Sequence, residues 1–386
     1  MDNSIYRCPL LQYSSTDLPT SSLLPTVTAQ DSPFGDASDL DLLSSLAYRR
    51  SDLDDGVINA ILYFPSHYPV HYYPSMGLFD WLPRFILEDI LLDVDLMTLV
   101  RCRELNSRAE ALIDDITTYR RLRQSAGNAV AALLCSGAAS FFSTRYVYSL
   151  MVLTSACNTC GQFGGFLFIP QGVRCCMYCL LTRPEFLPMS KHTAKRVFWL
   201  SETAFRDGSI PVMEGLSGLY GLHERRAVSR KRLFVSVALV KEKAAKNLTP
   251  RMVQQMENVE NIDDEHNANA GMAYEFEDPR SVVHATHLTR LQCAVPFPFV
   301  DIFAAGPIIQ TGISCRGCKQ VATWVPYMFS AEKKRRAIEM ELRMYTEDDF
   351  LEHIKGCEVA QQLWKKVICE AVNGEKVDPS ISPSST

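Results

Sequence analysis

The chain has 386 residues, of which 47% are apolar and 22% are charged. This composition is typical of soluble globular proteins and excludes a fully disordered, collagen-like or fibrous chain. The net charge is −5 at pH 7, so no overall basic field attracts nucleic acid or an anionic membrane. Residues 1–60 hold nine acidic and three basic side chains, a net charge of −6, which leaves +1 for the remainder. The acidity therefore belongs to the N-terminal segment.

Residues 1–76 are rich in Ser, Thr, Pro and Asp and show no sustained hydrophobic period, which predicts a disordered leader. The N-terminal sequence MDNSIYRCPLLQYSS lacks the basic start and the continuous apolar stretch of a secretory signal. The chain also has no apolar run of about 18 residues, the length that predicts a membrane span. We expect a cytoplasmic or nuclear protein with no membrane association.

The pattern becomes helical over residues 77–125. Leu82-Pro83 opens the first helix, because proline is tolerated in a first helical turn. Asp95 is positioned to cap a second helix, and Ala109, Leu112, Ile113 and Ile116 form the apolar stripe of a third.

The rest of the chain divides into four parts that differ in composition and sequence pattern. We expect a helical and Cys-rich module over 126–253, a flexible acidic insertion over 254–275, a second Cys/His module with C-terminal helices over 276–373, and a disordered Ser/Pro tail over 374–386. The short apolar run 233–240 fits a strand or a helix. The predicted fold is mostly α-helical with small β-rich zinc-binding modules: a three-helix unit followed by an α+β, zinc-stabilised body.

Thirteen cysteines are too few for a disulfide scaffold of this length, and an odd number cannot all pair. Their spacing indicates metal binding instead. The first predicted site consists of two Cys-x-x-Cys pairs, Cys157, Cys160, Cys176 and Cys179. Two residues between thiolates let one tight turn direct both sulfurs at one ion. Cys175 is a rival for Cys176, and a redox dithiol or buried structural cysteines are the alternatives without metal.

The second predicted site combines Cys315 and Cys318 with His353 and Cys357. If His353 and Cys357 lie four residues apart on one helix, imidazole and thiolate share a face and converge on the ion. The alternative is a surface histidine beside a core cysteine. Each site would have four protein ligands and no open position for water, which is typical of structural zinc. We therefore expect two structural zinc ions.

Other motifs give weaker evidence for a functional site. The sequence has no phosphate-binding loop, no Gly-x-Ser-x-Gly elbow and no His-Glu-x-x-His helix, so we expect no catalytic residues. His284 and His287 fit a solvated pair better than metal ligands. The basic clusters, Arg225/Arg226 with 230–232 and 333–336, fit a solvated surface better than an RNA-binding or nuclear-localisation signal.

Residues 78–123 resemble an F-box. The matching features are Leu82-Pro83, the Ile86-Leu87…Ile90 stripe, Leu99-Val100…Cys102, Leu105-Asn106 and Tyr119. Phe85 departs from the family, which usually has an acidic residue there. The order of the cysteine motifs, with Phe350-Leu351-x-His353-x3-Cys357 near the C-terminus, is similar to that of fungal F-box proteins with Cys-rich C-terminal regions.

The resemblance implies a non-catalytic substrate-receptor subunit of a cullin–RING (SCF-type) ubiquitin ligase. Its partners would be a Skp-type adaptor, a cullin and an unknown protein substrate. The implied adaptor-binding residues are Leu82, Pro83, Ile86, Leu87, Ile90 and Leu99. Such a subunit raises the local concentration of substrate beside the charged ubiquitin carrier. The rival hypotheses are a zinc-stabilised F-box scaffold outside any ligase and a zinc-dependent nucleic-acid binder, and the acidic net charge disfavours the second.

Overall fold

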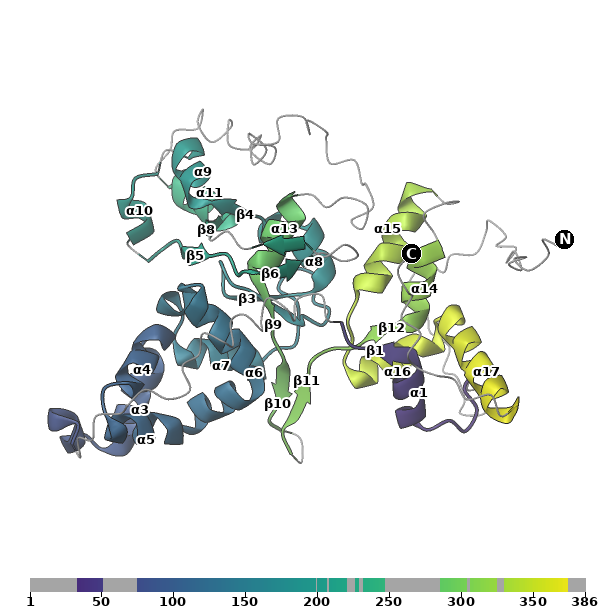
Figure 1. Cartoon of the computed structure of the whole chain (residues 1–386), viewed down its shortest axis with the longest axis horizontal. Coiled ribbons are helices and arrows are strands. Elements are labelled where there is room, and N and C mark those ends of the chain that lie inside the picture. Colours follow the sequence, from purple (N-terminus) through teal and green to yellow (C-terminus); the bar gives the residue numbers. More distant parts are fainter. Residues whose placement is uncertain are drawn as a thin grey trace. The chain divides into compact units, whose positions relative to one another are not determined.

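A computed structural model describes residues 33–50, 75–198, 200–206, 208–220, 226–228, 232–246, 285–303, 306–324 and 330–373. The chain divides into two compact units, Met1–Asp36 and Ala37–Thr386. The described part of the first unit is the turn at 33–36, and everything that follows concerns the second unit (Figure 1). The expected insertion over 254–275 and the tail over 374–386 lie outside the described residues, as do 1–32 and 51–74 of the expected leader.

The second unit is mostly helical, with small antiparallel sheets. Its N-terminal half contains α1 (Asp39–Leu46), β1 (Ala47–Tyr48), the 3₁₀ turn η1 (Gly77–Trp81), α3 (Arg84–Asp93), α4 (Leu96–Arg103), α5 (Ser107–Asp115), α6 (Thr117–Cys135), η2 (Ala138–Phe141) and α7 (Thr144–Val152). The middle contains β2 (Phe166–Phe168), β3 (Val173–Cys175), α8 (Met177–Thr182), η3 (Pro184–Phe186), β4 (Pro188–Ser190), α9 (Lys191–Val197), α10 (Thr203–Arg206), β5 (Met213–Glu214), β6 (Gly218–Tyr220), β7 (Arg226–Val228), β8 (Leu233–Ser236) and α11 (Val237–Ala245).

The C-terminal part contains α13 (Ala285–Gln292), β9 (Ala294–Pro296), β10 (Phe299–Asp301), β11 (Ile308–Gln310), β12 (Ser314–Cys315), α14 (Arg316–Trp324), α15 (Ala331–Leu342), α16 (Glu347–Lys355) and α17 (Glu358–Asn373). The sheets have the strand orders β3-β2-β9, β4-β8-β5, β10-β11, β6-β7 and β1-β12.

Side-chain caps fix where the short helices near residue 100 begin. The carboxylate of Asp95 accepts a hydrogen bond from the backbone N–H of Thr98 at 2.8 Å, which confirms it as the N-cap of α4. Asn106 caps α5 in the same way, through the N–H of Ala109. The expected third helix ends at Asp115, and the chain restarts as α6 at Thr117. The structure thus has three short helices, α3 to α5, followed by one long helix.

The expected domain boundaries are wrong in one respect, because strands from both sides of the 254–275 segment form one sheet. In that sheet β2 pairs with β3 on one side and with β9 on the other, with Leu167 opposite Val295. One continuous core runs from Leu87 to Met344 and joins the short helices to this sheet. The region 126–253 and the region after 276 are therefore parts of one folded body.

The N-terminal segment, expected to be a disordered leader, contains an ordered helix and strand. Helix α1 is capped by Ser38, buries Leu42 and Leu46, and packs against α16 and α17 (Figure 1). Strand β1 pairs with β12, so a segment from the start of the chain completes the C-terminal region.

The short run that fitted either strand or helix contains both. Strand β8 ends at Ser236, whose hydroxyl accepts a hydrogen bond from the N–H of Leu239 and starts α11. Strand β4 lies between η3 and α9 and pairs with β8.

Candidate metal centres

The first cysteine cluster is built from a tight loop and a strand-to-helix junction. The loop from Cys157 to Gln162 closes through the Cys157 N–H and the Gln162 carbonyl. Gly161 has a φ of +73°, as its place directly after a Cys-x-x-Cys turn predicts. Gly164 packs so closely that an added Cβ would lie 3.0 Å from the Cys157 nitrogen. The loop therefore needs glycine at both positions to direct Cys157 and Cys160 the same way.

The second pair of this cluster starts a helix. Cys176 is the N-cap of α8, and its Sγ accepts a hydrogen bond from the N–H of Cys179 at 3.3 Å. The Sγ atoms of Cys160 and Cys176 are 3.6 Å apart, and all four ligand atoms of Cys157, Cys160, Cys176 and Cys179 lie within 4.8 Å of one another. Cys175 is outside the cluster: it lies opposite Phe166 in the sheet and is fully buried. Geometry therefore favours Cys176 over Cys175.

The second cluster comes from three elements. Cys315 ends β12, and Cys318 lies in the first turn of α14. A Cβ on the intervening Gly317 would lie 2.6 Å from the backbone nitrogen of Ala360 in α17. This close approach requires glycine, and it brings the Cys-x-x-Cys turn against the start of α17.

His353 and Cys357 complete the second cluster, but they do not share a helix as expected. His353 is in α16, which ends at Lys355, and Cys357 lies in the corner before α17 begins at Glu358. The corner is held by hydrogen bonds from the Gly356 N–H to the His353 carbonyl and from the Cys357 N–H to the Ile354 carbonyl. The turn, and not a helical face, makes the two ligands converge.

Tyr345 orients the imidazole of His353. The two rings stack with centroids 4.5 Å apart and an interplanar angle of 19°. The Tyr345 hydroxyl lies 3.2 Å from Nδ1, which leaves Nε2 directed at the Cys318 Sγ, 3.3 Å away. A histidine ligand is commonly oriented through its other ring nitrogen in this way.

The separations within both clusters suit a tetrahedral ion. In the second cluster the Cys357 Sγ lies 3.9 Å from the Cys315 Sγ and 4.0 Å from the Cys318 Sγ. A tetrahedral zinc with bonds to sulfur of about 2.3 Å keeps its sulfurs about 3.8 Å apart. Both clusters can therefore hold a metal ion, and their ligand types are compatible with zinc.

Hydrogen bonds within each cluster lower the pKa of some thiols and raise the pKa of their donors, Cys176 and Cys179 in the first cluster and Cys315 and Cys318 in the second. Hydrogen bonds from Cys176 and Cys179 hold the pKa of Cys157 far below its usual value, and those from Cys315 and Cys318 do the same for Cys357. Cys160, whose main contact is also Cys176, has its pKa lowered to about 7. Since a thiolate is the ligand form of cysteine, each cluster already contains a group prepared to bind a cation.

Sequence reasoning missed the contribution of the N-terminal segment to the second cluster. Ala47 lies opposite Cys315 in the β1–β12 pair, and the Arg316 Nε donates to the Ala47 carbonyl at 3.1 Å. The Lys319 ammonium lies 4.8 Å from the centre of the Tyr48 ring. The sequence signal was a Ser38 cap before a helix with Leu42 and Leu46 four apart.

Arg174, which precedes the second cysteine pair, has a structural role that the sequence analysis did not assign. It is 2% exposed and donates to the carbonyls of Leu150, Gly164, Phe297 and Pro298. These carbonyls belong to the end of α7, to the first cysteine loop and to the segment after β9. A buried arginine that satisfies several carbonyls fixes the loop of Cys157 and Cys160 to the surrounding core.

The residues assigned to adaptor binding fall into two groups. Leu82, Ile86 and Ile90 are 37%, 37% and 43% exposed, and Pro83 is exposed as well. Leu87 and Leu99 are 4% and 0% exposed and belong to the core. These two buried side chains support the helices, so the exposed members of the set are the ones that we expect to contact a partner. Four further large apolar residues nearby in sequence are exposed: Leu78, Phe79, Trp81 and Phe85.

The weaker motifs lead to no site. Lys333, Arg335 and Arg336 in α15 are exposed, which fits the solvated-surface interpretation. His284, Arg225 and residues 230–231 lie outside the described residues. No helix in the described part of the chain is both long and apolar enough to span a membrane.

Comparisons with known proteins found no family model, no curated protein and no solved structure that matches this chain.

Proposed function

We propose that this protein is an F-box substrate receptor of a cullin–RING ubiquitin ligase, without catalytic residues of its own. In this proposal a Skp-type adaptor binds the helices near residue 85, and the body with the two cysteine clusters faces a protein substrate. The receptor would act in the cytoplasm or the nucleus. The observation that carries the proposal is an exposed apolar strip on η1 and α3.

The apolar strip is defined by Leu78, Phe79, Trp81, Leu82, Phe85, Ile86 and Ile90. Leu82, Ile86 and Ile90 recur every four residues, so the last two lie on one face of α3. Trp81 is 86% exposed and Phe85 is 66% exposed. Large aromatic side chains are costly to leave in water and are common anchors of protein interfaces. Seven exposed apolar residues, three of them aromatic, therefore support a docking surface for another protein.

The strip rests on a scaffold held by buried leucines and by ion pairs. Leu87, Leu91 and Leu92 fix α3 to the core from its other face. Arg84 bonds to Glu88 within α3 and to Asp115 at the end of α5, and Arg145 of α7 bonds to Asp93 at 2.6 Å. Exposed ion pairs contribute little energy each, but together they tie α3 to two neighbouring helices. The strip is thus presented by a helix with a fixed orientation, which lowers the entropic cost of binding.

The second part of the proposal is that both clusters hold structural zinc. Four ligands per cluster leave no open position for a reacting water. The body's sheets have two or three short strands each, and metal ligation would supply folding free energy to the loops between them. The zinc ions would then keep the substrate-facing part rigid and take no part in chemistry.

The adaptor proposal is tested by a double substitution in the strip. Interface anchors cost about 2 kcal/mol or more when truncated. Leu82→Ala with Pro83→Ala should cost about 3–4 kcal/mol of binding, a loss of several hundred-fold in affinity for a Skp-type adaptor. Trp81→Ala changes a side chain outside the core and should weaken binding without affecting folding. The measurement is adaptor and cullin capture from wild type and variants, with zinc content quantified in each.

Leu153→Ala is the matched control, since Leu153 is 71% exposed and lies outside the strip. It should capture adaptor and cullin like wild type. Undiminished capture by both strip variants would contradict the proposal. Adaptor without cullin would favour a scaffold outside any ligase, and salt-sensitive nucleic acid would favour the nucleic-acid hypothesis.

A further inference from the structure

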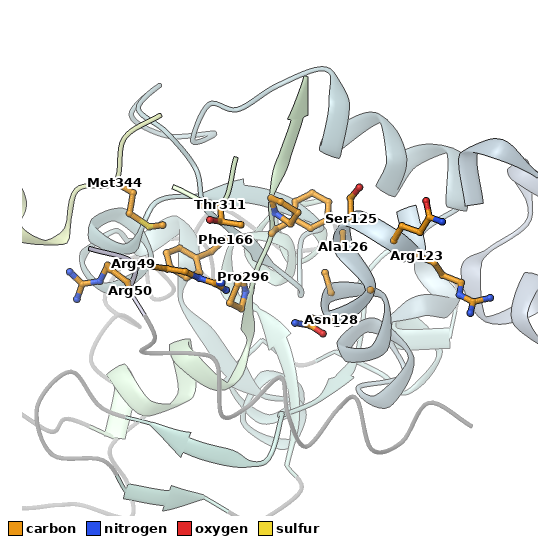
Figure 2. Close-up of a pocket in the computed structure, with 16 residues that line it drawn as sticks. Arg49, Arg50, Arg123, Ser125, Ala126, Asn128, Phe166, Pro296, Thr311 and Met344 are labelled. Atoms are coloured by element: carbon orange, nitrogen blue, oxygen red, sulfur yellow. The ribbon is translucent and has the colours of Figure 1, made fainter. Parts of the chain in front are cut away.

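A cavity of about 260 Å³ lies where α6, β2, β9 and the segment after β1 meet. Figure 2 shows Arg49 and Arg50 on one side of it and Arg123 on the other, with Phe166 and Pro296 between them. The volume is slightly below the roughly 300–1,000 Å³ of sites for drug-sized ligands. The cavity therefore has room for one small molecule.

The cavity wall carries cationic side chains, one of which, Arg123, is paired with Asp114. Its sixteen lining residues include three arginines and no aspartate or glutamate, and Gln124, Ser125, Asn128 and Thr311 add polar groups. Two of the arginines are anchored by neighbours: Arg50 donates to the Glu341 carbonyl at 2.9 Å, and Arg123 donates to Asp114 at 2.9 Å. A guanidinium carries five N–H donors in a planar fork that suits carboxylate and phosphate oxygens. Because a guanidinium has five donors, an arginine that bonds to its neighbours can also donate to an anion.

The rest of the wall is apolar. Phe166, Pro296, Phe297, Pro298 and Met344 line it. A simple inorganic anion would leave this part of the cavity filled with water. A ligand with an apolar frame would cover it and gain from the burial of apolar surface.

A kink in α6 forms one edge of the cavity. Ala126 has φ −127° and ψ 31°, outside the helical range, and all five residues 125–129 line the cavity. Gly127 follows the kink, and a Cβ placed there would meet no atom within 4 Å. A Cβ at position 127 would therefore displace no neighbour, and because Gly127 lines the cavity, we expect a larger side chain there to reduce its volume.

We propose that this cavity binds a small organic anion, a phosphate or carboxylate on an apolar frame. The anionic group would lie between the arginines, and the frame would pack on Phe166 and the prolines. Because Arg49 and Arg50 follow the strand beside the second cluster and Arg123 belongs to α6, the bound anion would connect these two parts of the body. The proposal goes beyond the adaptor-receptor function and does not depend on it.

The test is calorimetric titration of the full chain with simple probes. Phenyl phosphate and benzoate carry both an anion and a ring, whereas inorganic phosphate and benzyl alcohol carry one of the two. We expect at least one of the combined probes to bind about tenfold more tightly than either partial probe. Whichever of phenyl phosphate and benzoate binds more tightly identifies the anionic group. Equal affinity for inorganic phosphate and phenyl phosphate, with no binding of benzoate, would overturn the proposal, as would no binding of either combined probe.

Two variants locate the binding. Gly127→Leu should fill the cavity and weaken binding of the combined probe by about tenfold or more. The midpoint of thermal unfolding should stay the same or rise, because leucine favours a helix more than glycine does. Arg49→Gln should weaken binding of the same probe severalfold, because it removes one guanidinium. Arg121→Gln is the matched control, an exposed arginine of α6 that does not line the cavity. Wild-type affinity in both Gly127→Leu and Arg49→Gln would place the binding elsewhere and overturn the proposal.

Discussion

Ala47 and Cys315 lie directly opposite each other in an antiparallel strand pair, although 268 positions separate them in the chain. The pairing makes a segment near the N-terminus part of the support for a candidate metal ligand. Helix α1, just before Ala47, packs on α16, which contains His353, and on α17, which begins directly after Cys357.

This relationship predicts that α1 stabilises the second cluster. Leu46 is fully buried, so Leu46→Ala should cost about 2–5 kcal/mol of local stability. Residues 314–324 should then exchange backbone hydrogens faster, and a chelator should remove metal from the second cluster sooner than from the first. Leu40→Ala, at a position 78% exposed on the same helix, should leave both rates unchanged. Equal metal loss from the two clusters in Leu46→Ala would contradict the assigned role.

The two clusters predict two metal ions per chain. Elemental analysis of the purified protein should find two zinc ions, because each cluster has four ligand atoms within tetrahedral reach. Cys160→Ser should lose one ion and destabilise the first cluster. Cys175→Ser should retain both, since Cys175 is not a member of the cluster. Less than one zinc in a folded sample would refute the metal interpretation of both.

His353 predicts a proteolytic signature at the C-terminus. If it binds the ion held by Cys315, Cys318 and Cys357, then His353→Ala should loosen α16 and the corner that follows it. Limited proteolysis should cut the variant between Met344 and Trp364 and spare the wild type. Tyr345→Phe removes only the contact to Nδ1 and should weaken metal retention about 10–100-fold, the usual effect of losing an outer partner. Identical digestion and zinc content in His353→Ala would restore the surface-histidine alternative.

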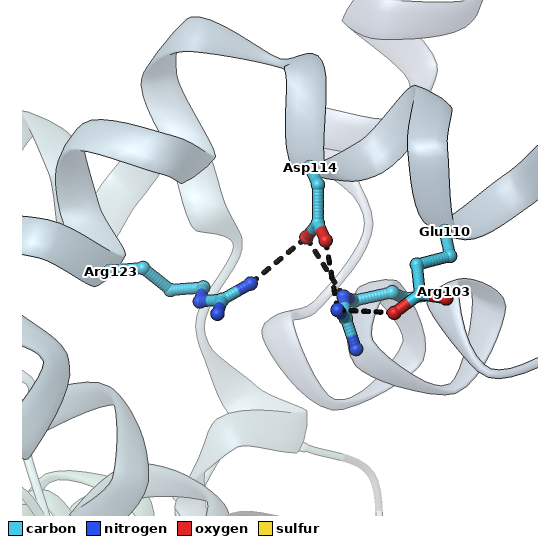
Figure 3. A network of polar contacts seen from close by, with 4 residues as sticks. All are labelled: Arg103, Glu110, Asp114 and Arg123. Atoms are coloured by element: carbon cyan, nitrogen blue, oxygen red, sulfur yellow. Dashed lines mark hydrogen bonds and ion pairs between the residues drawn. The ribbon is translucent and has the colours of Figure 1, made fainter. Parts of the chain in front are cut away.

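A network of charged side chains on α4, α5 and α6 predicts that the stability of the fold depends on pH. Arg103 donates two hydrogen bonds to Asp114 at 2.8 Å each and one to Glu110, and Arg123 adds another to Asp114 (Figure 3). Mainly through the bond from Arg103, the pKa of Asp114 lies below its usual value. A carboxyl with a lowered folded-state pKa stabilises the fold above its unfolded-state pKa of about 3.9, and this contribution is lost as the pH falls through the folded-state value.

Asp114→Asn should therefore destabilise the protein by about 1 kcal/mol at pH 7, a value reduced for partial exposure. The difference between wild type and variant should shrink as the pH falls below about 4. Urea unfolding at several pH values measures it, with Glu104→Gln, at an exposed position after α4, as the control. A difference that stays constant down to pH 3 would show that the network contributes through packing and not through charge.

The sequence by itself determined what depends on neighbours within a few residues. The Cys-x-x-Cys spacings, the Asp95 cap and the turn at Gly161 all appear in the structure, because a tight turn or a helix start is set by local backbone geometry. The pairing of the Cys157 and Cys176 halves was also predictable, since only 15 residues separate Cys160 from Cys176 and form a hairpin, β2–β3, between them.

Only the tertiary structure decided which distant strands pair and which apolar residues of one helix are buried. Leu87 and Ile86 are neighbours in one apolar stripe, yet one is buried and the other exposed, because α7 and the core cover only one face of α3. The pairing of β9 with β2 and of β1 with β12 joins segments more than a hundred residues apart. Strands of two or three residues have too little hydrophobic periodicity to predict such pairings from the sequence. The packing of the whole core selects them. The cavity between Arg49 and Arg123 exists only because those pairings bring its walls together.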